Sequence, residues 1–121
     1  MDAEELKQRT KEFALRIIKL VAALPKSVEG RAIANQLVRS GTSVAANYRS
    51  TCRARSRTEF IAKLGVVLEE ADETLLWLEL IVAGKILPAN RVNPLLKEAN
   101  ELVAIFVTSR KSAASNLKSK I

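Results

Sequence analysis

The chain has 121 residues, a formal net charge of +7 and 48% hydrophobic residues, so it can bury a core of its own and is not a disordered polymer. It contains no His and one Cys, which excludes a disulfide framework, a multi-Cys metal cluster and the commonest general base. Few Gly, Pro and aromatic residues argue against a turn-rich all-β fold. The basic charge favours an acidic partner such as nucleic acid, an anionic surface or an acidic protein.

Apolar residues recur at helical spacing in four segments, at about 3–24, 28–54, 57–84 and 94–115. The first predicted helix follows Asp2, a suitable N-cap, and stops before Pro25, which would remove a backbone hydrogen bond. Ser27 is the expected N-cap of the second helix. Ser40 and Gly41 interrupt its apolar stripe, so a neighbouring helix can approach closely there.

The third predicted helix begins with a capping box, in which Ser56 caps the helix and Glu59 follows three residues later. Its apolar residues then repeat in alternating steps of three and four, as in a heptad seam: Ile61, Leu64, Leu68, Ala71, Leu75, Leu78 and Val82. Gly84 is a natural stop for this helix.

The fourth helix is expected to open at Asn93-Pro94, because Asn caps helices and Pro is tolerated in the first turn. Residues 85–92 would then form a loop, and the basic tail 112–121 is expected to fray. Four helices with three short connections predict an all-α fold. We expect an antiparallel up-down-up-down four-helix bundle in a single domain over residues 1–121.

The chain starts with acidic and polar residues, unlike a secretory signal, and its apolar runs are much shorter than the roughly 20 residues that cross a bilayer. We therefore expect a cytoplasmic protein without membrane contact. Cys52 is expected to be an unpaired thiol in that compartment.

A polar cluster is predicted between the second and third helices. They run antiparallel about a turn near residue 56, so facing positions should sum to about 112. Arg39 then faces Glu73, and Ser43 faces Glu70. The predicted members of this cluster are Arg39, Ser43, Asn47, Tyr48, Glu70, Glu73 and Trp77. The cluster is either an ion-pair network that fixes the helix register or a pocket for a ligand or protein partner.

Basic residues gather where the second helix ends and the third begins: Arg49, Arg53, Arg55 and Arg57. Guanidinium groups match phosphate oxygens and release counterions, so these arginines and Lys63 form a candidate nucleic-acid-binding surface. Tyr48, which the register places beside Lys63, is the only aromatic residue nearby, and one ring is too little for a base-stacking platform. The alternative is a solvated basic turn that neutralises the dipole of the second helix.

Signatures of catalysis are missing from the sequence. The glycines stand alone rather than in a phosphate-binding loop, and neither Cys52 nor any serine has a His partner. Glu70 and Glu73 lack the Glu-x-x-His motifs of carboxylate metal sites in helical bundles. We expect no enzymatic activity, no catalytic residues, no metal and no cofactor.

Two central stretches resemble the 23S rRNA-intervening sequence proteins, four-helix bundles encoded in intervening sequences of bacterial ribosomal RNA genes. One is 37–49 (LVRSGTSVAANYR), and the other joins 60–65 (FIAKLG) to 70–79 (EADETLLWLE). The opening 13–20 (FALRIIKL) and the Leu24-Pro25 pair are also similar, so the resemblance covers nearly the whole chain.

The resemblance implies a small bacterial cytoplasmic protein that forms a homo-oligomer, a pentameric ring being known for the family. It also implies a likeness to the accessory proteins of diversity-generating retroelements, which bind nucleic acid and a reverse transcriptase through a basic surface. The family pattern is matched at Arg39, Ser43, Asn47, Tyr48, Arg49, Lys63, Glu70, Glu73 and Trp77. Ser50 stands where many relatives carry an acid, so the salt bridge of those relatives is expected to be absent.

The leading hypothesis is therefore a non-enzymatic, oligomeric bundle that binds RNA or DNA weakly and with little sequence preference. The second is a protein-interaction scaffold or accessory subunit, for example of a reverse-transcriptase-like partner, with no direct nucleic-acid role. This second hypothesis rests on the polar cluster and on apolar residues outside the main stripes: Ile18, Val38, Leu76 and Val103.

Overall fold

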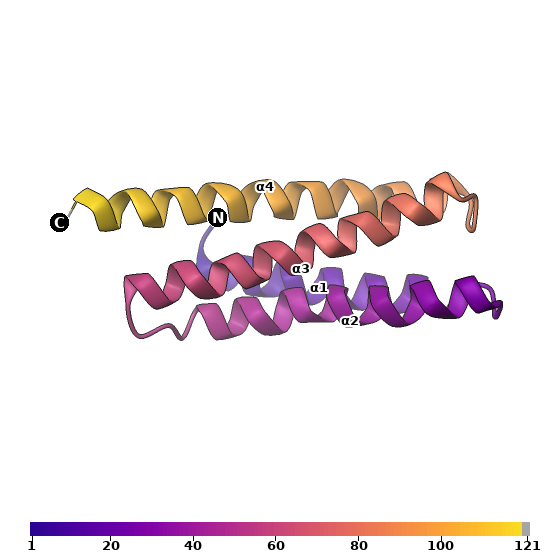
Figure 1. Ribbon diagram of the computed structural model, residues 1–121, viewed down its shortest axis with the longest axis horizontal. Coiled ribbons are helices and arrows are strands. Elements are labelled where there is room, and N and C mark those ends of the chain that lie inside the picture. The colour runs from indigo at the N-terminus through magenta and orange to yellow at the C-terminus, as the bar shows by residue number, and fades with distance from the viewer. Residues whose placement is uncertain (120–121) are drawn as a thin grey trace.

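The computed structural model describes the backbone of residues 1–119 and the side chains of residues 1–117. Within this part of the chain the elements are four helices and no strand: α1 (Ala3–Val21), α2 (Val28–Thr51), α3 (Arg57–Ala83) and α4 (Ala89–Ser119). Successive helices run antiparallel, and their connections lie at alternate ends of an elongated molecule (Figure 1). The predicted all-α, up-down-up-down four-helix bundle is confirmed.

Three helices begin at N-caps that the sequence predicts. The side chains of Asp2, Ser27 and Ser56 each accept a hydrogen bond from the backbone N–H three residues later, at 2.8, 3.1 and 3.1 Å. These bonds satisfy N–H groups that the first helical turn leaves without a partner. The same bond lowers the pKa of Asp2 from its ordinary value, because the N–H stabilises the carboxylate.

The start of α4 differs from the prediction. The helix begins at Ala89, five residues before the expected start at Pro94, and Pro94 lies inside it. A proline near the start of a helix removes a single backbone hydrogen bond. Val92 is fully buried in the added turn, and its packing against the core accounts for the earlier start.

The end of α4 also differs from the prediction. The helix continues to Ser119, so the described part of the basic tail does not fray. Within this tail Ala113 is only 3% exposed, so the helix still packs against the bundle at that position. Lys120 and the side chain of Lys118, both counted in the predicted basic tail, lie outside the described residues.

The turn between α3 and α4 closes with a Schellman motif. The N–H of Ile86 donates to the carbonyl of Ile81 at 3.0 Å, and the N–H of Lys85 donates to the carbonyl of Val82 at 3.1 Å. Gly84 is the C-cap in an ordinary right-handed conformation, whereas Lys85 takes the left-handed one, with φ of 55°. The helix thus ends where the sequence indicates, but the residue in the glycine-like conformation is Lys85.

The buried line of α3 is offset from the predicted heptad seam. The buried residues are Leu64, Val67, Ala71, Thr74, Leu78 and Ile81. Positions 61, 68, 75 and 82, which the seam assigned to the centre, are only half-buried. α3 packs on both α2 and α4, so its buried face is wider than the stripe of a two-stranded coiled coil.

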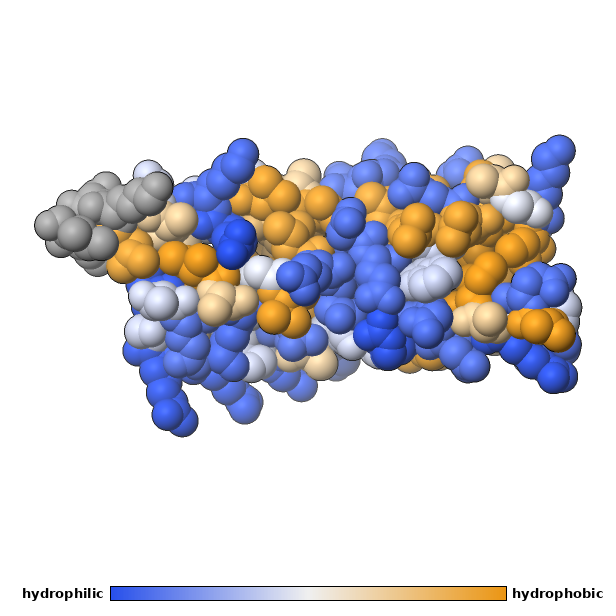
Figure 2. Space-filling model, viewed as in Figure 1, coloured by the Kyte–Doolittle hydropathy of each residue, from blue (hydrophilic) through white to orange (hydrophobic). Residues whose placement is uncertain are grey.

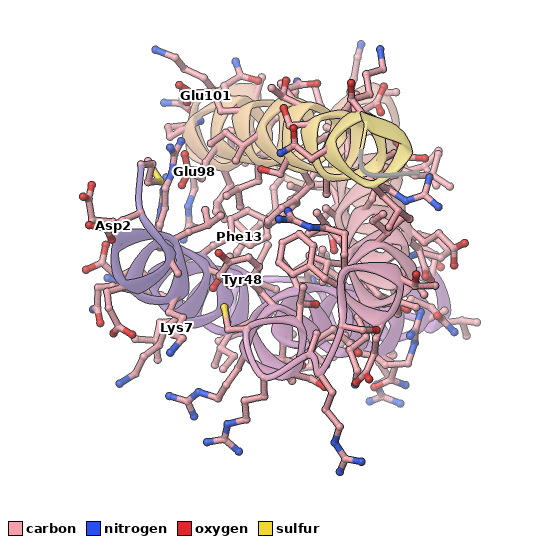
Figure 3. All side chains as sticks on the ribbon, turned by 90° about the vertical axis from the view of Figure 1, so that its left-hand side faces the viewer. Asp2, Lys7, Phe13, Tyr48, Glu98 and Glu101 are labelled. Atoms are coloured by element: carbon pink, nitrogen blue, oxygen red, sulfur yellow. The ribbon has the colours of Figure 1, made fainter. Side chains whose placement is uncertain are left out.

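α1 packs mainly on α2 and meets α4 in few places. Arg9 bridges this thin seam, with its Nε and Nη2 atoms donating to the two carboxylate oxygens of Glu98 at 2.7 and 2.6 Å. Glu98 and Glu101 face α1 from the side of α4 (Figure 3). Among the described residues no helix is long and apolar enough to cross a bilayer.

Candidate nucleic-acid interface

The four predicted arginines lie together at the end of the bundle where α2 joins α3. Arg49 is in the last turn of α2, Arg53 and Arg55 are in the connection, and Arg57 opens α3. All four are exposed, and none forms an ion pair with a described carboxylate. Hydrophilic side chains project from this end of the molecule (Figure 2).

The backbone of the α2–α3 connection is fixed by two hydrogen bonds. The N–H of Arg53 donates to the carbonyl of Ser50 at 3.0 Å, and the N–H of Ala54 donates to the carbonyl of Thr51 at 3.1 Å. Ala54 is half-buried, while its neighbours Arg53 and Arg55 are exposed. The connection therefore holds two guanidinium groups in solvent on a constrained backbone.

Lys63 differs from these arginines. Its ammonium donates a hydrogen bond to the hydroxyl of Ser50 at 2.8 Å and lies 3.9 Å from a carboxylate oxygen of Glu59. The half-buried Lys63 thus ties α3 to α2 through the neutral hydroxyl of Ser50. This hydrogen bond stands where a salt bridge is expected in relatives that carry an acid at position 50. The Lys63 side chain is 37% exposed, so Lys63 stays a predicted member of the candidate interface, with an acceptor for its ammonium already present in Ser50.

Sequence reasoning missed two cations of α1, Lys7 and Lys11, that lie close to the arginines of α2. Two adjoining cavities of about 300 and about 420 Å³ occupy the groove between α1 and α2, and both are lined by Lys7, Lys11 and Arg49. Arg53 lines the larger one, as do Glu4 and Gln8 of α1. Figure 3 views this end of the bundle, with Lys7 on the lower side of α1, toward α2. We call these four cations and the space between them the α1–α2 groove.

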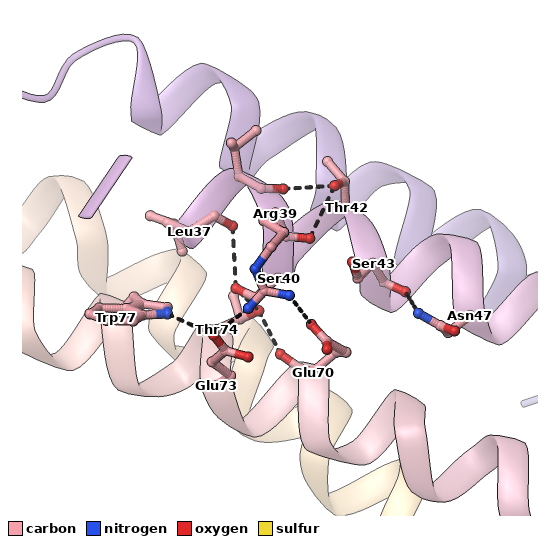
Figure 4. Close-up of polar contacts among 11 residues, drawn as sticks. Leu37, Arg39, Ser40, Thr42, Ser43, Asn47, Glu70, Glu73, Thr74 and Trp77 are labelled. Carbon is pink, nitrogen blue, oxygen red and sulfur yellow. Dashed lines mark hydrogen bonds and ion pairs between the residues drawn. The ribbon is translucent and has the colours of Figure 1, made fainter. Parts of the chain in front are cut away.

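The cross-helix cluster forms around Arg39 (Figure 4). Arg39 is in ion pairs with Glu70, at 3.3 Å between Nη1 and Oε2, and with Glu73. The indole N–H of Trp77 donates to the same Glu73 carboxylate at 3.4 Å. The hydrogen bond from Arg39 is the main reason that the pKa of Glu73 is lowered from its ordinary value. These contacts favour the interpretation of the cluster as a network that fixes the helix register.

The remaining predicted members do not join this cluster. The side-chain amide of Asn47 donates to the carbonyl of Ser43 at 2.9 Å, within α2 itself. Tyr48 is buried against Phe106, with ring centroids 5.8 Å apart. Burial, and then the adjacent Cys52 thiol, raise the pKa of Tyr48 well above its usual range. Tyr48 is therefore a core residue rather than a neighbour of Lys63 at the surface.

A second polar contact between α2 and α3 was not predicted. Ser40 and Thr74 are both fully buried, and their hydroxyl oxygens are 2.9 Å apart. The Thr74 hydroxyl also lies 2.7 Å from the carbonyl oxygen of Glu70. Satisfied hydroxyl groups can be buried at little cost, so this pair reinforces the register that Arg39 sets.

Comparison with known proteins agrees with this architecture. The family model described as 23S rRNA-intervening sequence protein matches residues 3–108. A crystal structure of a protein with unknown function from the S23 ribosomal protein family of Bacteroides thetaiotaomicron is 32% identical, with a TM-score of 0.83. The match covers 92% of this chain and 99% of that chain. No curated protein matches the chain. The chain belongs to the 23S rRNA-intervening sequence protein family.

Proposed function

We propose that this protein is a non-enzymatic, homo-oligomeric bundle that associates with RNA or DNA through the basic end at the α2–α3 connection. The observation that carries this proposal is the set of four exposed arginines without a described carboxylate partner: Arg49, Arg53, Arg55 and Arg57. Lys7 and Lys11 add cationic groups from α1 on the same side.

The chemistry of this surface suits phosphates rather than bases. Guanidinium groups form paired hydrogen bonds to phosphate oxygens, whereas no aromatic side chain lines the α1–α2 groove. Binding is therefore weak and tolerant of sequence. If each of the four arginines neutralises one phosphate, log K for duplex DNA falls against log salt with a slope of about −3.6.

Charge reversal at the connection should weaken binding strongly. The double variant Arg53→Glu/Arg55→Glu removes two phosphate contacts from a constrained loop, so we expect at least about tenfold weaker binding at low salt. The salt slope should become shallower by about 2, because each lost phosphate contact lowers it by about one. Fluorescence anisotropy of a labelled oligonucleotide over roughly 50 to 200 mM salt measures both quantities.

The matched control is Lys26→Glu/Lys97→Glu, which changes the net charge equally at exposed positions away from the connection. Its affinity should fall much less, because only long-range attraction is reduced. Equal losses in the two double variants would show that net charge alone governs binding. Absence of binding at low salt, or an affinity that salt does not change, would contradict the proposed function.

Exposed apolar residues support the oligomeric part of the proposal and the alternative of a protein scaffold. Leu76 and Leu80 of α3 are 49% and 42% exposed, among acidic neighbours of the same helix. Leu15 and Ile18 of α1 are also exposed, beside basic residues. Hydrophobic side chains gather over α3 and α4 on the face in Figure 2. An acidic, apolar face that complements a basic, apolar one favours head-to-tail contacts between copies, which form a ring when the rotation from copy to copy closes.

The assembly that the family resemblance implies is a pentamer. Light scattering should therefore give a mass of about five times the 13.3 kDa of the chain. Leu76→Glu/Leu80→Glu should shift it toward the monomer, because two carboxylates would be desolvated in the contact. Val28→Glu is the control, since Val28 is 87% exposed in the first turn of α2, where Glu is favourable. A wild-type chain that stays monomeric at high concentration would remove the oligomer from the proposal.

A further inference from the structure

The α1–α2 groove is lined by short side chains as well as by cations. Besides its cations, the part nearest the middle of the bundle is lined by the short side chains of Thr42, Ala45 and Ala46. They lie with Arg49 on one face of α2, at steps of three and four residues. Ala46 is exposed and Ala45 is half-buried, so no long side chain of α2 fills the groove between the cations.

The cations of the groove come from both helices. Lys11 forms no ion pair with a described carboxylate, and Lys7 pairs with Glu4 of its own helix at 2.9 Å. The Glu4 side chain is 84% exposed, so this surface pair contributes little and a phosphate can displace it. A polyanion in the groove would therefore meet lysines on the α1 side and arginines on the α2 side, with Glu4 as the one carboxylate among the lining residues.

The width of the groove limits what can enter it. The furrow between two packed helices, whose axes lie about 8–10 Å apart, is narrower than a duplex, whose major groove alone is roughly 12 Å wide. A duplex is stiff over about 150 base pairs, so it can touch only the outer cations. A single strand is flexible, so its phosphates can follow the groove and reach the cations of both helices.

We propose that the α1–α2 groove holds the sugar–phosphate backbone of single-stranded RNA or DNA, and that the short residues of α2 make the protein prefer single strands to duplexes. This inference rests on the proposed nucleic-acid association and names the form of nucleic acid that enters the site. Discrimination comes from the shape of the groove, since both forms of nucleic acid carry the charge that the arginines attract.

The substitution Ala46→Leu tests the shape of the groove without changing its charge. Leu is nearly as good a helix former as Ala, and position 46 is exposed, so the fold should be retained, as circular dichroism would verify. Binding of oligo-dT and oligo-U of roughly 12 nucleotides should weaken about tenfold. Binding of a duplex of the same length should stay within about twofold of wild type.

Ala32→Leu is the matched control, because Ala32 is an exposed alanine of the same helix outside the groove. It should leave both affinities unchanged. If wild type binds single strands and duplexes but Ala46→Leu lowers neither affinity, or lowers both alike, the groove inference is wrong and the proposed function stands. If wild type binds neither at low salt, the proposed function is wrong as well.

Discussion

Replacing Phe106 by Ala should destabilise the bundle by about 3–5 kcal/mol, the cost of removing a fully buried phenyl ring. Phe106 is on α4, and its ring packs against Tyr48 of α2 at 5.8 Å between centroids. The contact joins two helices that are not consecutive in the chain. Truncation therefore removes transfer free energy, leaves a cavity and loses an aromatic contact at the same time.

Urea denaturation followed by circular dichroism measures this loss as a lower midpoint with an unchanged slope. Phe60→Ala is the control, since Phe60 is half-buried at the start of α3 and should lose clearly less free energy of unfolding. Similar losses for the two variants would mean that the Tyr48–Phe106 contact does not lie at the centre of the core.

The register of α2 against α3 could be predicted because the turn between them is well marked in the sequence. Ser56 caps α3 as expected, and facing positions were expected to sum to about 112. The ion pair of Arg39 with Glu73 meets that sum. The hydrogen bond of Lys63 to Ser50 differs from it by one residue.

Prediction failed where a local preference competed with tertiary packing. The sequence pattern favours Leu75 over Thr74 as a core residue, yet Thr74 is fully buried because its hydroxyl has partners inside the bundle. Pro94 indicates a helix start, yet burial of Val92 extends α4 by five residues before it. Neither hydroxyl partners nor burial in an added turn can be derived from periodicity.

The candidate site was predictable only in the part that is contiguous in sequence. Arg53 and Arg55 lie two residues apart, so their proximity is certain before any fold is known. Lys7 and Arg49 are far apart in sequence, and only the register between α1 and α2 brings them together. The residue that could have predicted this register is Gly41, because its missing side chain leaves room for Ile17 of α1 to come close.

Gly41→Leu should destabilise the protein by about 3 kcal/mol, at the upper end of the range for overpacking. A Cβ atom at position 41 would lie 2.8 Å from Cγ2 and 2.9 Å from Cγ1 of Ile17. Ile17 is fully buried, so its side chain cannot move aside without disturbing the hydrophobic core of the bundle. The remaining response is for α1 to move away from α2.

The matched pair Gly41→Ala and Gly65→Ala separates this steric effect from helix propensity. Alanine gains about 1 kcal/mol over glycine inside a helix at both positions. At position 65 the added Cβ would lie 3.3 Å from Nε of Arg110, an exposed side chain whose long 3.3 Å hydrogen bond to the carbonyl of Ile61 need yield by only a few tenths of an ångström. Gly65→Ala should therefore be neutral or stabilising, whereas Gly41→Ala should be destabilising by up to about 2 kcal/mol in urea denaturation.

The Gly41 variants also connect stability to the proposed binding site. The groove exists because α1 lies close enough to α2 for Lys7 and Arg49 to line one cavity. If Gly41→Ala moves α1 outward, single-strand affinity should fall at temperatures where the variant is still folded, while Gly65→Ala retains it. If Gly41→Ala is instead more stable than wild type, α1 and α2 can accommodate a methyl group at position 41 without moving apart. The width of the groove would then not depend on Gly41.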